Sequence, residues 1–213
     1  MSSDDWFRRT TWTDDDRTDF SDRLKRARKY NRPQYLRIQA VHLADAGNDV
    51  AALELLDQFL DIDDGGIDLA QAQLQRAASL LARGNVRDAV NAFRASLDAE
   101  RKRPNVQTEA WLLFPWFIVE TQMVDLYAEA GDILSEFANR RSLTFPKSEY
   151  HFHCVNAILL AHADDHAQAS VHAEKALAAS NATHSGFRYH AKLGLVRDKS
   201  STVHERVFQI AAK

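Results

Sequence analysis

The chain has 213 residues, with 27 Lys and Arg against 30 Asp and Glu, and a formal net charge of -3. That balance excludes a global electrostatic field that would recruit nucleic acid or an anionic membrane. Apolar residues make up 45% of the chain, whereas glycine and proline together make up only about 5%, against about 12% on average. These proportions favour a folded and mostly helical protein.

Three features of the sequence indicate a cytoplasmic protein. The single cysteine, Cys154, excludes an intramolecular disulfide and fits a reducing compartment. The first residues are acidic and lack the basic-then-apolar order of a signal peptide. The longest apolar run covers only residues 111–119 and contains Pro115, which is too short for the roughly 20 residues that span a bilayer.

The N-terminal segment, residues 1–31, predicts an aromatic arm followed by a capping helix. Its aromatic residues follow neither a helical nor a strand period: Trp6, Phe7 and Trp12. We expect them to fold back onto the first helices, and the alternative is an arm that inserts into a partner, because exposed aromatics anchor interfaces. Thr13 with Asp16 three residues later, an acidic first turn and a basic last turn predict a helix from Thr13 onward.

Two helical hairpins are predicted next, each interrupted at a glycine followed by asparagine. The first covers residues 33–60 around Gly47, and the second covers 67–100 around Gly84. The two superpose at an offset of 37 residues, with alanine, a large apolar residue and leucine five, nine and thirteen residues after the glycine. The matched positions are Ala52 and Ala89, Leu56 and Phe93, and Leu60 and Leu97.

Two further segments extend the pattern. Residues 159–177 follow the same rule if Asp164 takes the place of the glycine. Residues 125–140 match with Gly131 as the turn but lack the alanine, and we interpret them as a degenerate copy. Such internal self-similarity is typical of repeat proteins.

The pattern resembles the tetratricopeptide repeat, a unit of about 34 residues built from two antiparallel helices with small residues where they cross. The resemblance covers residues 32–180 and is divergent; it is carried by Gly47/Ala52, Gly84/Ala89 and Ala157/Ala169. It implies an all-α, right-handed solenoid of antiparallel helix pairs. Residues 181–213 are predicted to form C-terminal capping helices, a last hairpin over 187–196 and 203–212.

The resemblance also implies a ligand-binding concave face, lined by the first helix of each pair. The positions expected to line it are Gln34, Arg37, Val41, Gln71, Leu74, Thr121, Asp125 and His151. Arg37 is a candidate handle for an anion. The Lys and Asn arrangement with which the family binds carboxylates is not matched.

The segment around Trp111 and Trp116 is the densest apolar stretch of the chain. It is apolar beyond one helix face, so we expect either a helix buried on nearly all sides or aromatic side chains exposed for a partner or for self-association. Pro115 either starts this helix or kinks it.

Sequence motifs give no support for catalysis. There is no nucleophile elbow, no phosphate-binding glycine loop and no dinucleotide fingerprint, and Cys154 lies in an apolar helical pattern typical of buried, inert cysteines. A zinc site from His151, Cys154 and His162 is a weak candidate, because imidazole and thiolate suit that ion. Surface histidines, or a surface that responds to pH, are the alternatives. We expect no cofactor.

These observations favour a non-enzymatic scaffold that binds one protein or peptide in its groove, with neither nucleic acid nor membrane as partner. One alternative is an antitoxin-type immunity protein or a protein that controls an effector, whose acidic loops meet a basic patch. A second alternative is a metal-binding protein that uses the His/Cys segment. Self-association into a homodimer remains open.

Overall fold

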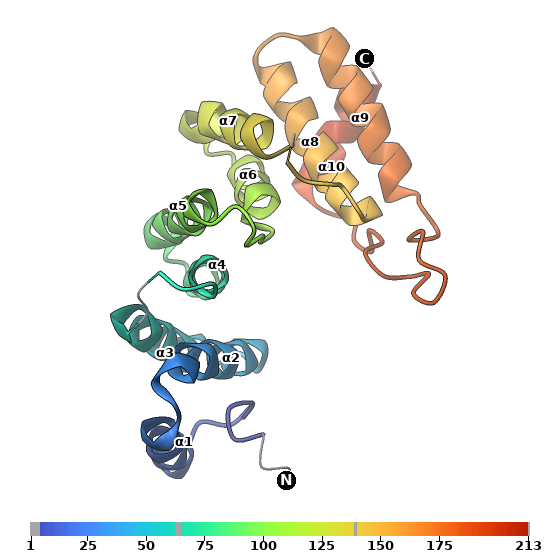
Figure 1. Cartoon of the computed structure of the whole chain (residues 1–213). Coiled ribbons are helices and arrows are strands. Elements are labelled where there is room, and N and C mark those ends of the chain that lie inside the picture. The colour runs from blue at the N-terminus through green and yellow to red at the C-terminus, as the bar shows by residue number, and fades with distance from the viewer. Residues whose placement is uncertain (1–4, 63–64, 139, 213) are drawn as a thin grey trace. The chain divides into compact units, whose positions relative to one another are not determined.

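The computed structural model of the chain describes residues 5–62, 65–138 and 140–212. Within these ranges it contains ten α-helices and no strand, which confirms the predicted all-α class (Figure 1). The helices are α1 (Asp14–Arg26), α2 (Arg32–Asp45), α3 (Asp49–Ile62), α4 (Leu69–Ala82), α5 (Val86–Lys102), α6 (Ala110–Glu120), α7 (Tyr127–Ala138), α8 (Pro146–His162), α9 (His166–Ser180) and α10 (Thr202–Ala211). Short 3-10 helices, η1 (Lys29–Asn31) and η2 (Val124–Leu126), precede α2 and α7.

Two compact units make up the chain, Met1–Ala110 and Trp111–Lys213. In the first unit α2 packs against α3, α4 against α5, and α3 against α4. In the second unit α8 packs against α9, and α10 packs against both of them (Figure 1). The hairpins predicted over residues 33–60 and 67–100 are therefore confirmed as packed helix pairs.

Among the described helices, none combines the length and the apolar character that crossing a membrane requires.

Four helices end in the same backbone arrangement. The second residue after each helix has a positive φ: 81° at Gly47, 74° at Gly84, 55° at Gln122 and 60° at Asp164. The next amide then donates a hydrogen bond back to the carbonyl five residues earlier, as in the pair Asn85 N to Leu80 O at 2.9 Å. This is the Schellman cap, which satisfies carbonyls that a helix end leaves without partners.

The third of these caps corrects the predicted repeat. Gly131, expected to form the turn, lies inside α7, and the turn is at Gln122 instead. Gly131 was misleading because the turn itself contains glutamine and no glycine marks it. In addition, the Met123 side chain has no oxygen that could accept a hydrogen bond at the start of the next helix. Asn85 and Asp165 do accept such a bond from a backbone amide, whereas Met123 is followed by η2, so that α7 begins only at Tyr127.

The predicted alanines of the repeat are in the core. Ala52, Ala89 and Ala169 are fully buried, as are the apolar residues that follow four positions later: Leu56, Phe93 and Ala173. Small side chains at these positions allow two helices to approach closely.

The aromatic arm folds back, as predicted. The Trp6 ring contacts the rings of Phe20 and Tyr35 at centroid distances of 5.3 and 5.0 Å, and the Trp12 ring lies 5.4 Å from that of Phe20. Thr13 and Asp16 form the predicted capping box of α1. Because these aromatic side chains join the core cluster of the first unit, the alternative of an arm inserted into a partner is not supported.

A buried glutamine fixes the same arm. The Gln39 side chain, with no exposed area, accepts a 3.0 Å hydrogen bond from the Arg9 amide and donates a 2.7 Å bond to the Arg9 carbonyl. The Arg9 guanidinium pairs with Asp16 at 2.6 Å and with Asp19. Both the oxygen and the nitrogen of the Gln39 side-chain amide are thus hydrogen-bonded to the backbone of Arg9. Such pairing is what burial of a polar group requires.

The predicted helix over residues 187–196 is wrong. This segment consists of turns and irregular chain, and only α10 of the expected final hairpin is present. The physical reason is the docking of the segment on the start of α8. The Gly194 carbonyl accepts a 2.8 Å bond from the Lys147 amide, and a Cβ on Gly194 would come within 2.6 Å of Phe145. An orphan amide at the N-terminus of α8 is thereby satisfied.

The aromatic segment forms core, which was the first of the two expectations. Trp111, Phe114 and Ile118 are buried in the second unit, and Pro115 lies inside α6. Trp116 is half-buried and stacks on His151 with ring centroids 4.1 Å apart.

Candidate functional site

The residues expected to line a concave face have different environments. Gln34 is exposed, and Val41, Gln71 and His151 are half-buried. Leu74 was predicted to be available to a ligand, but it is buried in the core. Thr121 and Asp125 were predicted on the first helix of the third pair, but they lie beyond α6, in the turn and in η2. The misplacement of Thr121 and Asp125 follows from placing the third turn at Gly131 rather than at Gln122.

Arg37 is engaged within the first unit. Its Nε donates a 2.7 Å hydrogen bond to the Asp68 carboxylate, and both side chains are about one-fifth exposed. The pair joins α2 to the residue just before α4. An incoming anion would have to displace Asp68, so Arg37 is a poor handle.

The three weak zinc candidates do not form a metal site. Among the described residues, no group of three or more His, Cys, Asp or Glu side chains is arranged to hold a metal ion. His151 stacks on Trp116, and the His162 ring contacts the ring of Tyr127 edge-on at 5.0 Å. Burial raises the pKa of the Cys154 thiol to about 12 and so keeps it protonated, which fits an inert core cysteine.

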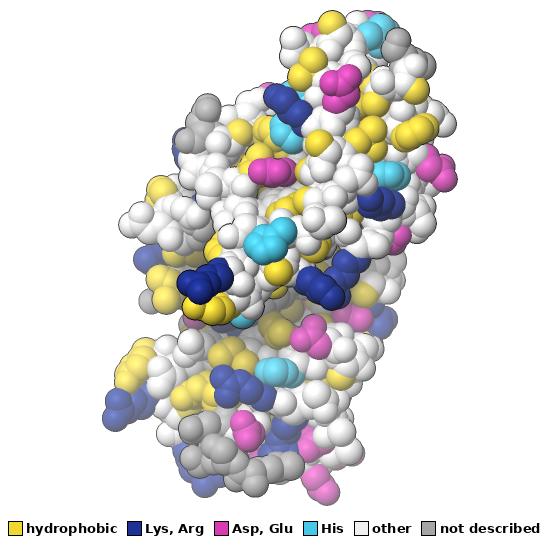
Figure 2. Space-filling view, turned by 90° about the vertical axis from the view of Figure 1, so that its right-hand side faces the viewer, with side chains coloured by type: hydrophobic (Ala, Val, Ile, Leu, Met, Phe, Trp, Pro, Cys, Tyr) yellow, Lys and Arg dark blue, Asp and Glu magenta, His cyan; other side chains and the backbone are white. Residues whose placement is uncertain are grey.

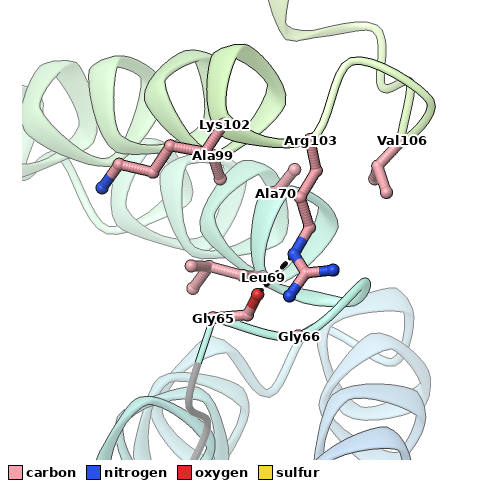
Figure 3. A pocket seen from close by; sticks show the side chains of 8 residues that line it. All are labelled: Gly65, Gly66, Leu69, Ala70, Ala99, Lys102, Arg103 and Val106. Atoms are coloured by element: carbon pink, nitrogen blue, oxygen red, sulfur yellow. Dashed lines mark hydrogen bonds between the residues drawn. The ribbon is translucent and has the colours of Figure 1, made fainter.

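A pocket in the first unit, not anticipated from the sequence, combines basic and apolar groups. It has a volume of about 440 Å³ and lies between the start of α4 and the end of α5 (Figure 3). Its lining consists of Gly65, Gly66, Leu69, Ala70, Ala99, Lys102, Arg103 and Val106. Volumes of this order hold small ligands or single side chains of a partner.

Arg103 crosses this pocket. Its Nε donates a 2.7 Å hydrogen bond to the Gly65 carbonyl, shown by the dashed line in Figure 3, and ties the loop before α4 to the end of α5. Figure 3 also shows Lys102 extending along the opposite side of Ala99 from Arg103. Two cations at the C-terminus of α5 also suit the negative end of the helix dipole.

A buried carboxylate holds the loop that completes the pocket. Glu100, only 1% exposed, accepts a 3.0 Å hydrogen bond from the Thr108 amide and a second bond from the Thr108 hydroxyl. The Val106 amide donates a 2.8 Å bond to the Arg103 carbonyl. These bonds fix the chain between α5 and α6 and place Val106 at the rim.

The sequence contained a signal for this pocket. The basic run at the end of α5 and the Gly65-Gly66 pair, each taken alone, are typical of ordinary loops. A helical hairpin, however, brings the residue before its first helix beside the residue after its second. Pairing the two ends of the second predicted hairpin would have placed Arg103 near Gly65.

The second unit has a larger and less polar pocket of about 540 Å³, lined by Ala161, His166, Ala167, Ser170 and Ile210. It lacks a lysine or arginine to orient a ligand. On the molecular face drawn in Figure 2, Lys and Arg side chains are interspersed with Asp and Glu, and the histidines lie apart from one another. We therefore take the Lys102/Arg103 pocket as the candidate site.

Comparisons with protein-family models, with curated proteins and with solved structures found no match to this chain. The resemblance to the tetratricopeptide repeat therefore stays a prediction.

Proposed function

We propose that the chain is a non-enzymatic binding scaffold, a divergent tetratricopeptide-like array that binds a peptide segment of a partner protein. The equivalent helix caps at positions 47, 84, 122 and 164 support the array, since each joins two consecutive helices. Their spacings of 37, 38 and 42 residues are more regular than the glycines suggested and lie near the family unit of about 34. Stacking such pairs into a right-handed solenoid is how each pair would bury its apolar stripe.

The observation that carries the choice of ligand is the position of Arg103 above an apolar pocket wall. Leu69, Ala70 and Val106 offer contact to an aliphatic or aromatic side chain. The Arg103 guanidinium uses Nε for the Gly65 carbonyl, and its geometry suits a carboxylate on two further N–H donors. The proposed ligand is therefore a peptide in which an apolar side chain neighbours a carboxylate.

Two sequence-based expectations accompany this proposal and stay predictions. One is the cytoplasmic location, and the other is that the partner is a protein or peptide rather than nucleic acid or membrane. An antitoxin-type role would be one biological setting for such a scaffold.

Selection from a phage-displayed library of random peptides tests the proposal. We expect enriched peptides to carry Asp or Glu beside Leu, Ile, Val or Phe. Binding of a synthetic copy should weaken at least about tenfold in Arg103→Gln, because a charged hydrogen bond contributes about 1.5–3 kcal/mol. Lys102→Gln should weaken binding less, since a flexible ammonium forms no bidentate pair.

Arg87→Gln is the matched control, because Arg87 is exposed on the same helix α5 but at its opposite end. It should bind the peptide like the wild type. Enrichment of peptides without acidic residues, or equal binding by Arg103→Gln and Arg87→Gln, would contradict the proposed site.

A further inference from the structure

Two histidines meet between helices of the second unit. His153 on α8 and His172 on α9 have their Nδ1 atoms 3.0 Å apart, with ring centroids at 5.0 Å and ring planes inclined by 61°. A hydrogen bond at this distance requires one ring to carry its proton on Nδ1 and the other to accept it. Both side chains are half-buried, so both residues keep some surface exposed to solvent.

The surroundings hold this pair in place. The Phe152 ring lies 5.2 Å from the His153 ring and 6.3 Å from the His172 ring, so one aromatic ring lies close to both imidazoles. The two helices that carry the histidines pack directly against each other. The two nitrogens are thus supplied by rigid elements rather than by loops, which favours a preorganised site.

We propose that His153 and His172 form a bidentate site for a divalent transition metal ion, with Zn²⁺ as its representative, bound through the two Nδ1 atoms. Two nitrogens bound to zinc at about 2.0–2.1 Å are about 3.3 Å apart at a tetrahedral angle, so the observed separation of 3.0 Å has to grow by only about 0.3 Å. Each ring must also turn, so that its Nδ1 lone pair points at the metal ion rather than at the other nitrogen. Water molecules complete the coordination, since the described residues offer no third ligand. Imidazole is a good donor for zinc, copper and nickel.

The protonation of the pair suits metal binding. Burial, and next the neighbouring charges, lower the pKa of His153 to about 4 and lower that of His172. Near neutral pH both rings are therefore neutral, and coordination requires no net loss of a proton. The ring that carries its proton on Nδ1 exchanges it with water for one on Nε2. Lys175, whose charge contributes to both shifts, opposes the metal ion electrostatically.

Calorimetric titration of the untagged, chelator-treated full chain with Zn²⁺ tests this site. We expect one Zn²⁺ per chain at this site and a higher Tm in its presence, because a ligand that binds the folded state stabilises it. His172→Gln and His153→Gln should each lower the affinity at least as much as the roughly 10- to 100-fold that loss of an outer-shell partner costs. Lys175→Gln should raise the affinity, since it removes a positive charge next to the ion.

His190→Gln is the control for adventitious binding, because His190 is an exposed histidine of the same unit. It should leave the affinity unchanged. Two-bond ¹H–¹⁵N spectra of the wild type give a readout that does not depend on the folding of any variant: Zn²⁺ should shift Nδ1 of His153 and His172 together. No binding by the wild type, binding by both pair variants as tight as that of the wild type, or shifts at other histidines alone would overturn the proposal.

Discussion

The amide of Met123 donates a 3.0 Å hydrogen bond to the carbonyl of Ile118, five residues earlier. Asn48 makes the equivalent bond to Leu43, and Asp165 makes it to Leu160. The same helix cap thus recurs where the sequence has glycine and where it does not. At the third cap Gln122 takes the left-handed conformation that glycine occupies at the first two, with φ of 55°.

Replacing Gln122 by glycine should therefore stabilise the protein. The left-handed conformation costs a residue with a Cβ about 1 kcal/mol, and the exposed Gln122 side chain contributes little in return. We expect the free energy of unfolding in urea to rise by about 1 kcal/mol in Gln122→Gly. An unchanged or lower value would mean that the turn at 122 is strained elsewhere or is placed differently in solution.

Gly131→Ala should also stabilise the protein, because Gly131 is inside α7 and not in a turn. Alanine is favoured over glycine within a helix by about 0.5–1 kcal/mol. An added Cβ would lie 3.8 Å from Leu159 Cδ1, an ordinary contact. Gly84→Ala is the matched control, and it should destabilise by about 1 kcal/mol because Gly84 has a φ of 74°. Destabilisation by Gly131→Ala would contradict the position of Gly131 inside α7 and would favour the turn predicted there from the sequence.

Gln39→Leu should release the aromatic arm. The change removes both hydrogen bonds to the Arg9 backbone, and we expect a loss of about 1–3 kcal/mol in the free energy of unfolding. Limited proteolysis should then cut the chain ahead of α1 faster than in the wild type. Gln34 lies on the same helix and is exposed, so Gln34→Leu is the matched control. Its free energy of unfolding should stay within about 0.5 kcal/mol of that of the wild type. Equal protease resistance in both variants would show that aromatic packing alone holds the arm.

Acid should destabilise the second unit partly through His151. Burial, with a smaller contribution from the charge of Lys147, lowers the pKa of His151 from 6.5 to about 4. The unfolded chain therefore binds more protons between these two values, so this contribution is complete above pH 6.5 and is lost as the pH falls toward 4. His151→Phe keeps the stacking on Trp116 but cannot titrate.

Thermal unfolding of wild type and His151→Phe from pH 7 to pH 4 measures this effect. The variant should lose less Tm over that range than the wild type does, whereas His190→Gln should follow the wild type. Parallel pH profiles for His151→Phe and the wild type would assign the acid sensitivity to other groups.

The helices that could be predicted from the sequence are those whose start and end signals lie in neighbouring residues. The capping box at Thr13, the Gly-Asn turns at 47 and 84 and the apolar spacing of α2 to α5 each depend on neighbouring residues, and the structure agrees with them. The third turn could not be found this way. Gln122 carries no turn signal, and Gly131 carries a misleading one.

The site was harder to predict than the fold because it depends on residues distant in sequence. Arg103 and Gly65 meet only because α4 and α5 fold back on each other, and His153 reaches His172 only across the pair of α8 and α9. Arg37 was singled out as a handle for an anionic ligand, but it pairs with Asp68, which lies 31 residues away in the sequence. The pattern of residues within one helix does not show which residue of another element will pair with it.

The most direct test of the proposed binding site is to map a selected acidic peptide onto the ¹⁵N-labelled full chain by amide chemical-shift changes. The largest changes should fall at Gly65, Gly66, Ala70, Arg103 and Val106, and they should be lost in Arg103→Gln. Changes confined to the second unit, or to α2 around Arg37, would contradict the site and with it the ligand class that we propose.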